Sequence, residues 1–504
     1  MRLNSSVLKL YKVPLLMVLG SLAFFTAFAY DLVRTDYIKL VLFYAVLFFL
    51  FYKLIQLTKH NLKLLTWVAF MFRTIFILAI PNLSQDFYRF IWDGRMILEG
   101  FNPYLYTPES FIANGKFPVV QAQELYAGMG SLSANHFTNY PPLNQLCFVI
   151  SGLFAGKSIL GSAIVLRLLI ITADFGTLYF GKKLLEKLKL PAHNIFWYIL
   201  NPFIIIELTG NLHFEGVMIF FLVWSLYLLY SGKWKFAAIV FACSVSIKLI
   251  PLLFLPLFYQ WFTKRNTSRK LSNYIKSNVI STEQSDQKSH NQIENKNDEM
   301  LKQVQHDEKK IPTFAGMTKL AGFYVIVGFV TLLLFLPFYS SQFINNYAET
   351  VALWFKNFEF NASLYYVIRE IGYLFRGYNE IAIIGQFTAI IVFLFVVGMA
   401  FFRKNKTMVQ LITAMLFALS LYYFTASTVH PWYIATLLIL SVFTKYKFTL
   451  VWSFVIVLSY LAYANNDNSE NLWIIGLEYL IVYGVFIYEV WFRPKQSNLI
   501  KRLL

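Results

Sequence analysis

The segment Pro81–Arg95 contains two carboxylates and an intervening arginine, Asp86, Arg89 and Asp93, at a spacing that favours acid–base chemistry. Ser84 is a suitable N-cap, so the segment predicts a helix that starts directly after it. Offsets of three and seven residues return to the same side of a helix, so Asp86, Arg89 and Asp93 would share one face. A carboxylate on that face could accept a proton from a hydroxyl nucleophile. The alternative is an amphipathic helix whose Asp–Arg pair only solvates its polar face.

A second group of polar residues stands between two apolar runs and consists of Glu207, Asn211, His213 and Glu215. These residues could support a base or bind an acceptor, or they could be ordinary residues at helix ends. His213 and Glu215 could also join Asp86 in holding a divalent cation. The spacing is not that of a strict metal site, so the need for a metal stays open.

Three basic side chains stand at the borders of other apolar runs. Lys248 lies at the tip of an apolar hairpin, where it suits an anionic ligand or else snorkels to the interface. Arg369 suits bidentate contact with a phosphate, or it pairs with nearby glutamates. His430 opens a His-Pro-Trp-Tyr string that ends at Tyr433 and could bind a ligand or form an aromatic belt at the interface.

The elements that must position these residues are membrane helices. Of the 504 residues, 58% are hydrophobic and only 14% are charged, and the apolar residues fall in runs long enough to cross a bilayer. The net charge of +18 does not indicate a nucleic-acid partner, because the basic residues recur in short loops between apolar runs. Cys147 and Cys243 lie in apolar segments without CxxC spacing, so neither a disulfide nor a metal framework follows.

The apolar runs predict an all-α bundle of about 14 spans. We expect them near 13–30, 38–57, 63–80, 159–181, 194–208, 215–231, 235–248, 250–262, 320–338, 381–402, 408–427, 431–444, 448–464 and 471–491. The pair 235–248 and 250–262 could be one kinked helix broken at Pro251. The first run favours an uncleaved helix over a signal peptide, because it is longer than a usual signal core.

The distribution of lysine and arginine predicts the orientation. With these spans the basic clusters and both termini face the cytoplasm, and the long loop 81–158 faces outward. Leu143–Ala155 is apolar, but a crossing there would invert every later loop, so we expect a re-entrant or surface-lying segment. The predicted domains are an N-terminal transmembrane module (1–262) with its outer loop, a disordered polar cytoplasmic insertion (263–318) and a C-terminal transmembrane module (319–504).

Several motifs follow one another along the chain in a recognisable order. They are Ser84-x-Asp86-x-Tyr88-Arg89-x-x-Trp92-Asp93-Gly94-Arg95, Gly100-x-Asn102-Pro103-Tyr104, Tyr140-Pro141-Pro142-Leu143, Arg167, Asn361-x-Ser363-x-Tyr365-Tyr366 and His430-Pro431-Trp432-Tyr433. Together they resemble the GT-C glycosyltransferases, and most closely the polyprenol-phosphate-mannose-dependent bacterial mannosyltransferases of the glycosyltransferase-87 type and their GPI-mannosyltransferase relatives. The resemblance covers almost the whole chain apart from the insertion.

The resemblance implies an enzyme that moves a sugar, mannose above all, from a polyprenyl-phosphate donor to a lipid or glycan acceptor with inversion. The active site would face the periplasm from a bacterial inner membrane, and juxtamembrane helices would carry it in the first periplasmic loop. Asp86 is then the expected general base and Asp93 the second candidate. The expected donor phosphate or sugar ligands are Arg89, Lys248, Arg369, His430 and Tyr433. The acceptor-binding or supporting residues are Arg95, Tyr140, Glu207, Asn211, His213, Glu215 and Asn361.

Three other classes of protein stay open. A transporter or flippase for lipid-linked saccharides would carry paired charges deep within its spans and symmetric halves, whereas the centres of these spans are largely free of charge and no repeat is evident. An O-antigen-type polymerase would be an enzyme with a different donor. A non-catalytic membrane scaffold is the third alternative, and an Asp86→Ala variant that retains full sugar transfer would favour it.

Overall fold

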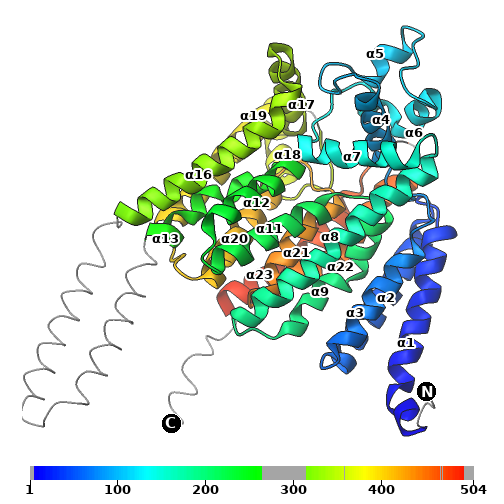
Figure 1. The fold of residues 1–504 in the computed structure, drawn as a ribbon, viewed down its shortest axis with the longest axis vertical. Coiled ribbons are helices and arrows are strands. Elements are labelled where there is room, and N and C mark those ends of the chain that lie inside the picture. The colour runs from blue at the N-terminus through cyan, green and yellow to red at the C-terminus, as the bar shows by residue number, and fades with distance from the viewer. Residues whose placement is uncertain (1–4, 264–313, 357, 466, 468, 493–504) are drawn as a thin grey trace, which may run out of the picture.

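The structure is a computed structural model that describes residues 5–263, 314–356, 358–465, 467 and 469–492. These residues form helices joined by irregular segments (Figure 1). Most of the predicted insertion, 263–318, lies outside the described residues. Its two borders are helical, since Thr263 closes one helix and Phe314 opens the next, six residues before the predicted start of that span.

The N-terminal half begins with three helices and the helices of the long loop. They are α1 (Ser5–Tyr30), α2 (Tyr37–Thr58), α3 (Leu62–Ile75), α4 (Asp86–Leu98), α5 (Pro108–Ile112), α6 (Ala122–Ala134) and α7 (Pro142–Ala155). The segments that follow, in which η marks a 3-10 or π turn, are α8 (Ile159–Lys187), η1 (Ala192–Ile195), α9 (Phe196–Ile199), α10 (Pro202–Ile204), η2 (Ile205–Gly210), α11 (Glu215–Tyr230), α12 (Trp234–Ile247), η3 (Ile250–Leu257) and α13 (Phe258–Thr263).

The C-terminal half is again helical. It contains α16 (Phe314–Phe335), η4 (Leu336–Phe338), α17 (Ser341–Lys356), α18 (Leu364–Arg376), α19 (Ile381–Phe401), α20 (Met408–Thr425), η5 (Pro431–Tyr433), α21 (Ile434–Val442), α22 (Phe448–Val455), η6 (Ile456–Ala464), α23 (Leu472–Ile487) and η7 (Tyr488–Phe492). Phe360 and Thr428 form an isolated parallel bridge between two of its loops.

Among the described residues, 7 helices are long and apolar enough to cross a membrane, or up to 8 if the bent pair Pro202–Gly210 and Glu215–Tyr230 counts as one span. Each of the remaining predicted spans falls on a shorter or broken helical segment. The 14 residues of α3 rise about 21 Å, which is less than the ~30 Å of a bilayer core. The sequence therefore located the helices, while the structure supports a smaller number of full-length crossings.

The basic loops gather at one end of the bundle. Lys187 Nζ donates to Ser231 Oγ (2.6 Å), and Gln260 Nε2 donates to the Arg403 carbonyl (2.6 Å). Loops that are distant in sequence therefore lie together. The start of α1 and the last turns of α23 lie toward this end, away from α4, α5 and α6 (Figure 1). The predicted separation of basic loops from the long loop is thus a feature of the fold.

The helices of the long loop pack tightly against the bundle. A Cβ on Gly94 would lie 2.2 Å from the carbonyl oxygen of Phe148, so only glycine allows α4 to approach α7 this closely. At the same crossing, a Cβ on Gly152 would lie 2.7 Å from Leu98 Cδ1. The apolar stretch 143–155 forms α7, which has 14 residues and is too short to span a membrane, as expected. This helix packs against the end of the bundle.

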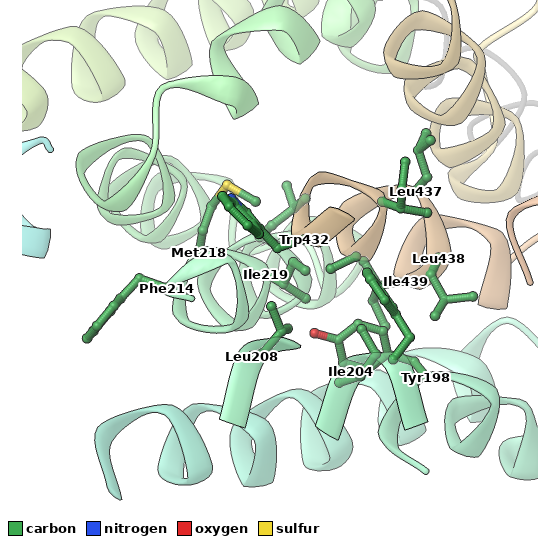
Figure 2. Close-up of a cluster of buried hydrophobic side chains, with 14 of the residues drawn as sticks. Tyr198, Ile204, Leu208, Phe214, Met218, Ile219, Trp432, Leu437, Leu438 and Ile439 are labelled. Carbon is green, nitrogen blue, oxygen red and sulfur yellow. The ribbon is translucent and has the colours of Figure 1, made fainter. Parts of the chain in front are cut away.

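The chain bends by 114° between η2 and α11 and then runs back into the bundle as α11. Arg167 Nε and Nη2 hold the bend by donating to the carbonyls of Thr209 (2.8 Å) and Gly210 (2.9 Å). Side chains from this segment, α11 and α21 form one buried cluster (Figure 2), in which Leu208, Ile219 and Leu437 are almost inaccessible to solvent. The cluster gives the turn a rigid base.

An ion pair lies inside the bundle, contrary to the sequence-based view that the centres of the spans are largely free of charge. Arg73 Nε contacts Asp174 Oδ2 at 2.7 Å, and both side chains are fully buried. Arg73 also donates to the carbonyls of Ala69 (3.0 Å) and Ile199 (2.8 Å). The pair connects α3 to α8 and α9 and does not line the large cavity described below. We therefore interpret it as a structural contact.

Candidate active site

A cavity of about 1110 Å³ opens at the end of the bundle that carries the long loop. Its wall is built by both halves of the chain. The polar side chains in it include Arg34, Asp86, Arg89, Tyr140, Glu215, Lys248, Glu359, Tyr366, Arg369, His430, Tyr433 and Glu470. Eight of the predicted site residues therefore share one space: Asp86, Arg89, Tyr140, Glu215, Lys248, Arg369, His430 and Tyr433.

Asp86 lies in the first turn of α4 and points into this cavity. The helix starts at Asp86 with Gln85 as its N-cap, one residue later than predicted; Ser84 instead accepts the Asp86 backbone N–H through its Oγ (3.3 Å). Burial raises the pKa of Asp86 to about 6, and the charge of Glu215 adds to this, while Lys248 and Arg34 act in the opposite direction. A carboxylate with that pKa is mostly ionised at neutral pH and is basic enough to accept a proton.

Lys248 and Glu215 form a charged pair whose two members both act on the pKa of this base. Lys248 caps α12 in an extended conformation, and its Nζ lies 3.0 Å from Glu215 Oε1 and 5.1 Å from the centre of the Tyr140 ring. Glu215 stands in the first turn of α11, where the helix dipole favours an anion. The lysine is thus held over the cavity by a carboxylate and a ring, with part of its surface left accessible.

An aromatic stack fixes the histidine side of the cavity. The Trp432 ring stacks on His213 at 3.7 Å and on His430 at 4.6 Å between ring centroids. Only His430 and Trp432 of these three line the cavity, and Tyr433 lines it beside them. The predicted His-Pro-Trp-Tyr motif therefore contributes directly, and His213 supports it from behind.

Arg34 is a cavity residue that sequence reasoning missed. It lies in the loop between α1 and α2, its Nη1 donates to the Leu83 carbonyl (3.4 Å), and its guanidinium lies 4.2 Å from the centre of the Tyr463 ring. One signal was present in the sequence. An arginine in a loop assigned to the outer face runs against the usual bias of basic residues toward the cytoplasm.

The wall on the α18 side carries two glutamates: Glu359, which the sequence suggested only as a partner of Arg369, and Glu470, which sequence reasoning missed. Arg369 pairs there with Glu359 inside the cavity and with Glu370 (2.9 Å) on the exposed side. Glu470 accepts from the Asn361 backbone N–H (2.6 Å) and from the Tyr366 hydroxyl. The alternative reading of Arg369, pairing with neighbouring glutamates, is what the geometry shows.

Asp93, the second candidate base, is remote from the cavity surface. Its Oδ1 lies 2.7 Å from Arg89 Nε, its Oδ2 accepts from Gln145 (3.1 Å), and its side chain is fully buried. Arg89 bridges the two environments, because it lines the cavity while it holds Asp93 and the carbonyls of Ser133 and His136. The three residues predicted to meet on one face are therefore divided into a cavity residue, a bridging residue and a buried residue.

The remaining candidates lie behind the cavity wall. Arg95 donates to the Val120 carbonyl (2.7 Å), Glu207 accepts from the Tyr460 hydroxyl (2.7 Å), and Asn211 accepts from the Leu83 backbone N–H (2.9 Å). The 114° bend divides the cluster 207–215, so that only Glu215 reaches the cavity.

Asn361 also lies outside the cavity lining. It adopts a left-handed backbone conformation (φ 47°), and its side-chain Nδ2 donates to Glu478 (3.2 Å) while its backbone orients Glu470. Among the described residues no group of three or more His, Cys, Asp or Glu side chains is arranged to hold a metal ion, so the trio Asp86, His213 and Glu215 is not such a site.

Comparison with known proteins gives one family. Residues 14–264 match the model described as "Alpha-(1->6)-mannopyranosyltransferase, N-terminal domain". The chain is also similar to Alpha-(1->6)-mannopyranosyltransferase A of Mycobacterium tuberculosis, with 21% identity over 191 residues. That alignment covers 38% of this chain and 35% of the relative, so it spans about a third of the relative's own length.

The matched region includes most of the chemistry-bearing residues of the N-terminal half, from Arg34 through Asp86 and Glu215 to Lys248. The expectation of a mannosyltransferase family with transmembrane helices is confirmed. Through its N-terminal half, the chain belongs to the alpha-(1->6)-mannopyranosyltransferase family of membrane mannosyltransferases.

Proposed function

We propose that the protein transfers a mannosyl residue from a polyprenyl-phosphate donor to a hydroxyl of a lipid or glycan acceptor, with inversion and with Asp86 as general base. The observation that carries this proposal is the position of Asp86 in a cavity large enough for two ligands, with a pKa raised to about 6 and Lys248 nearby. The family membership supports mannose as the sugar.

The proposed reaction is a single displacement. Asp86 takes the proton of the acceptor hydroxyl as the acceptor oxygen bonds to the anomeric carbon, and the bond from that carbon to the phosphate oxygen breaks on the opposite face. The electron pair leaves with the lipid phosphate. By analogy with the relative's printed name, the linkage would be alpha-(1->6), which makes the nucleophile a primary hydroxyl.

The leaving phosphate needs a positive charge that is not already neutralised by carboxylates. Arg369 is paired with two glutamates and Arg89 with Asp93. Lys248 has one carboxylate partner, and Arg34 contacts a carbonyl and a ring. Arg34 and the partly accessible Lys248 therefore suit the donor phosphate better than Arg369 does, with His430 as a neutral hydrogen-bonding group beside them, and such contacts lower the barrier to departure of the leaving group.

The finer architecture is part of the proposal. The chain would cross a bacterial inner membrane about 14 times, counting shorter and broken helices, with both termini cytoplasmic and the cavity facing the periplasm. Residues 1–262 and 319–504 would be its two transmembrane modules. The grouping of basic loops at the end opposite α4–α6 supports this orientation.

The activity is tested with purified protein, radiolabelled polyprenyl-phosphate mannose and a panel of lipid and glycan acceptors. Wild type should transfer label and Asp86→Asn should not, whereas Glu186→Gln, at an exposed position of α8 outside the cavity lining, should keep wild-type transfer. Transfer from nucleotide sugars alone would reject the donor class. Undiminished transfer by Asp86→Asn would remove that residue from the mechanism.

The orientation is tested with a membrane-impermeant thiol reagent on intact cells, in a variant without native cysteines. Asn114→Cys, in the exposed turn after α5, should be labelled, and Lys233→Cys, between α11 and α12, should react only after permeabilisation. The reverse pattern would place the cavity on the cytoplasmic side and contradict the proposal.

A further inference from the structure

The cavity wall beside α18 differs in charge from the wall that carries Lys248. Of the cavity-lining residues there, Glu359 and Glu470 are acidic and Arg369 is basic. Arg369 is already matched by Glu359 and, from outside, by Glu370. The excess of carboxylate disfavours a phosphate at this wall and favours a ligand that donates hydrogen bonds.

Both glutamates are held rigidly and keep accepting capacity. Glu470 receives the Asn361 backbone N–H (2.6 Å) and the Tyr366 hydroxyl, while Glu359 receives the Tyr365 hydroxyl, the Asn379 amide and Arg369. An ionised carboxylate offers about four lone-pair sites. Each group therefore has room for at least one further donor, and a sugar presents several hydroxyl donors.

Aromatic rings complete this wall. Tyr366 lies against Arg369, 4.4 Å from ring centre to guanidinium carbon, and the Phe360 and Tyr463 rings have centroids 5.7 Å apart. All of these side chains line the cavity. Fixed carboxylates beside aromatic rings in the cavity lining match a saccharide, whose hydroxyls donate to oxygen acceptors and whose C–H groups pack on aromatic rings.

We propose that Glu359, Glu470 and Tyr366 form the subsite for a neutral saccharide of the acceptor, next to the site of the donor phosphate, with the Phe360 and Tyr463 rings between the two, since these rings also contact His430 and Arg34. This inference rests on the proposed transferase function and adds a division of the cavity: a cationic wall for the donor and an acidic, aromatic wall for the acceptor. The volume of about 1110 Å³ exceeds the usual range of roughly 300–1,000 Å³ for a site that holds one small ligand.

The test combines saccharide binding with transfer kinetics on the full-length protein in nanodiscs. The probe is a soluble α-linked mannose trisaccharide, used in saturation-transfer NMR and as the acceptor with labelled polyprenyl-phosphate mannose. The variants are Glu470→Gln, Glu359→Gln and Tyr366→Phe, and the matched control is Glu186→Gln, at an exposed position of α8 outside the cavity lining. In Glu470→Gln the amide oxygen can still accept the Asn361 N–H, and the amide nitrogen can donate to the Tyr366 hydroxyl oxygen, so the wall should remain folded; thermal unfolding verifies this.

The expected result for Glu470→Gln is an increase of about tenfold in the dissociation constant and in the KM for the acceptor, with the KM for the donor within about twofold of wild type. Glu186→Gln should match wild type in both. A raised donor KM with unchanged acceptor binding, or saccharide binding unaffected in all three variants, would overturn the subsite. A wild type that binds the trisaccharide through Glu470 but transfers no mannose would overturn the proposed function and leave the subsite standing.

Discussion

The first turn of α4 and the rest of the same helix meet opposite surroundings. Asp86 faces the cavity, and burial raises its pKa to about 6. Two turns later, Asp93 is enclosed by Arg89 and Gln145 with no surface on the cavity. The two aspartates share a helix and a face by periodicity, so their different roles come from what other helices place against them: open space at the first turn, and α6 and α7 at the later turns.

This contrast teaches that packing, and not residue type, separates a base from a structural carboxylate. A carboxylate without full solvation or close pairing holds its proton more strongly and can exchange it with a substrate, whereas one in a buried ion pair is stabilised in its charged form. Substitutions along α4 should therefore reduce activity at Asp86 and reduce stability at Asp93.

The largest effect is expected for Asp86→Asn. Removing a general base typically lowers the rate by about 10²–10⁴-fold, because the acceptor hydroxyl must then lose its proton unaided. The folded-state pKa of Asp86 is raised from 3.8 to about 6. The protonated carboxyl group therefore favours folding most below pH 4, and this contribution is lost as the pH rises through 6. The asparagine variant should consequently unfold no earlier than wild type at pH 7.5.

Transfer kinetics and thermal unfolding of the same preparation check this prediction. A variant that loses activity only because it unfolds would show that the first turn of α4 is structural as well.

The next effect is expected for Asp93→Leu, which should reduce stability by about 3–5 kcal/mol, because Arg89 would keep its charge in a buried site without its partner. The matched control is the double variant Arg89→Met with Asp93→Leu, which removes both charges and should recover much of the loss. Chemical unfolding in detergent measures both. Loss of transfer in Asp93→Asn without any loss of stability would indicate a role for Asp93 in the chemistry.

Gly94→Ala should cost less, about 1–3 kcal/mol, because its Cβ would lie 2.2 Å from the Phe148 carbonyl and would push α4 away from α7. Gly398→Ala in α19 is the control: no atom lies within 4 Å of a Cβ there, so the substitution should be neutral or slightly stabilising. Tryptophan fluorescence during heating compares the two. Equal melting temperatures would mean that the α4–α7 crossing is not tight in the folded protein.

The smallest effect is a shift in the pH profile. Wild-type kcat/KM should fall as the pH drops below about 6, where Asp86 becomes protonated. Lys248 lowers the pKa of Asp86, so Lys248→Gln should move this acidic limb to higher pH. A pH series of initial rates, measured at saturating and at limiting donor, separates this shift from weaker donor binding. An unmoved limb in Lys248→Gln would mean that another group controls it.

Prediction from sequence reached the helices and about half of the site. Hydropathy located the apolar helical segments but not the more polar helices α5, α6, α17 and α18, and residue types at the borders of apolar runs pointed to Glu215, Lys248 and His430, which line the cavity. Helical periodicity could not reveal that α6 and α7 cover the face bearing Asp93, because that depends on contacts between distant segments. Arg34 and Glu470 come from short loops with no motif, and only the fold brings them to the cavity.

The two halves of the chain interlock at both ends of the bundle. At the cavity end, Asn346 Nδ2 in α17 donates to the Tyr104 carbonyl (2.9 Å), and Asn102 Nδ2 donates to the Phe338 carbonyl (3.2 Å). At the other end, Phe262 and Phe323 pack with ring centroids 5.4 Å apart, beside the point where the described chain is interrupted. Continuity of the polypeptide between 263 and 314 is thus not what aligns the walls of the cavity. Residues up to 263 and from 314 onward, co-expressed as two polypeptides, should find each other in the membrane and assemble the same composite chamber.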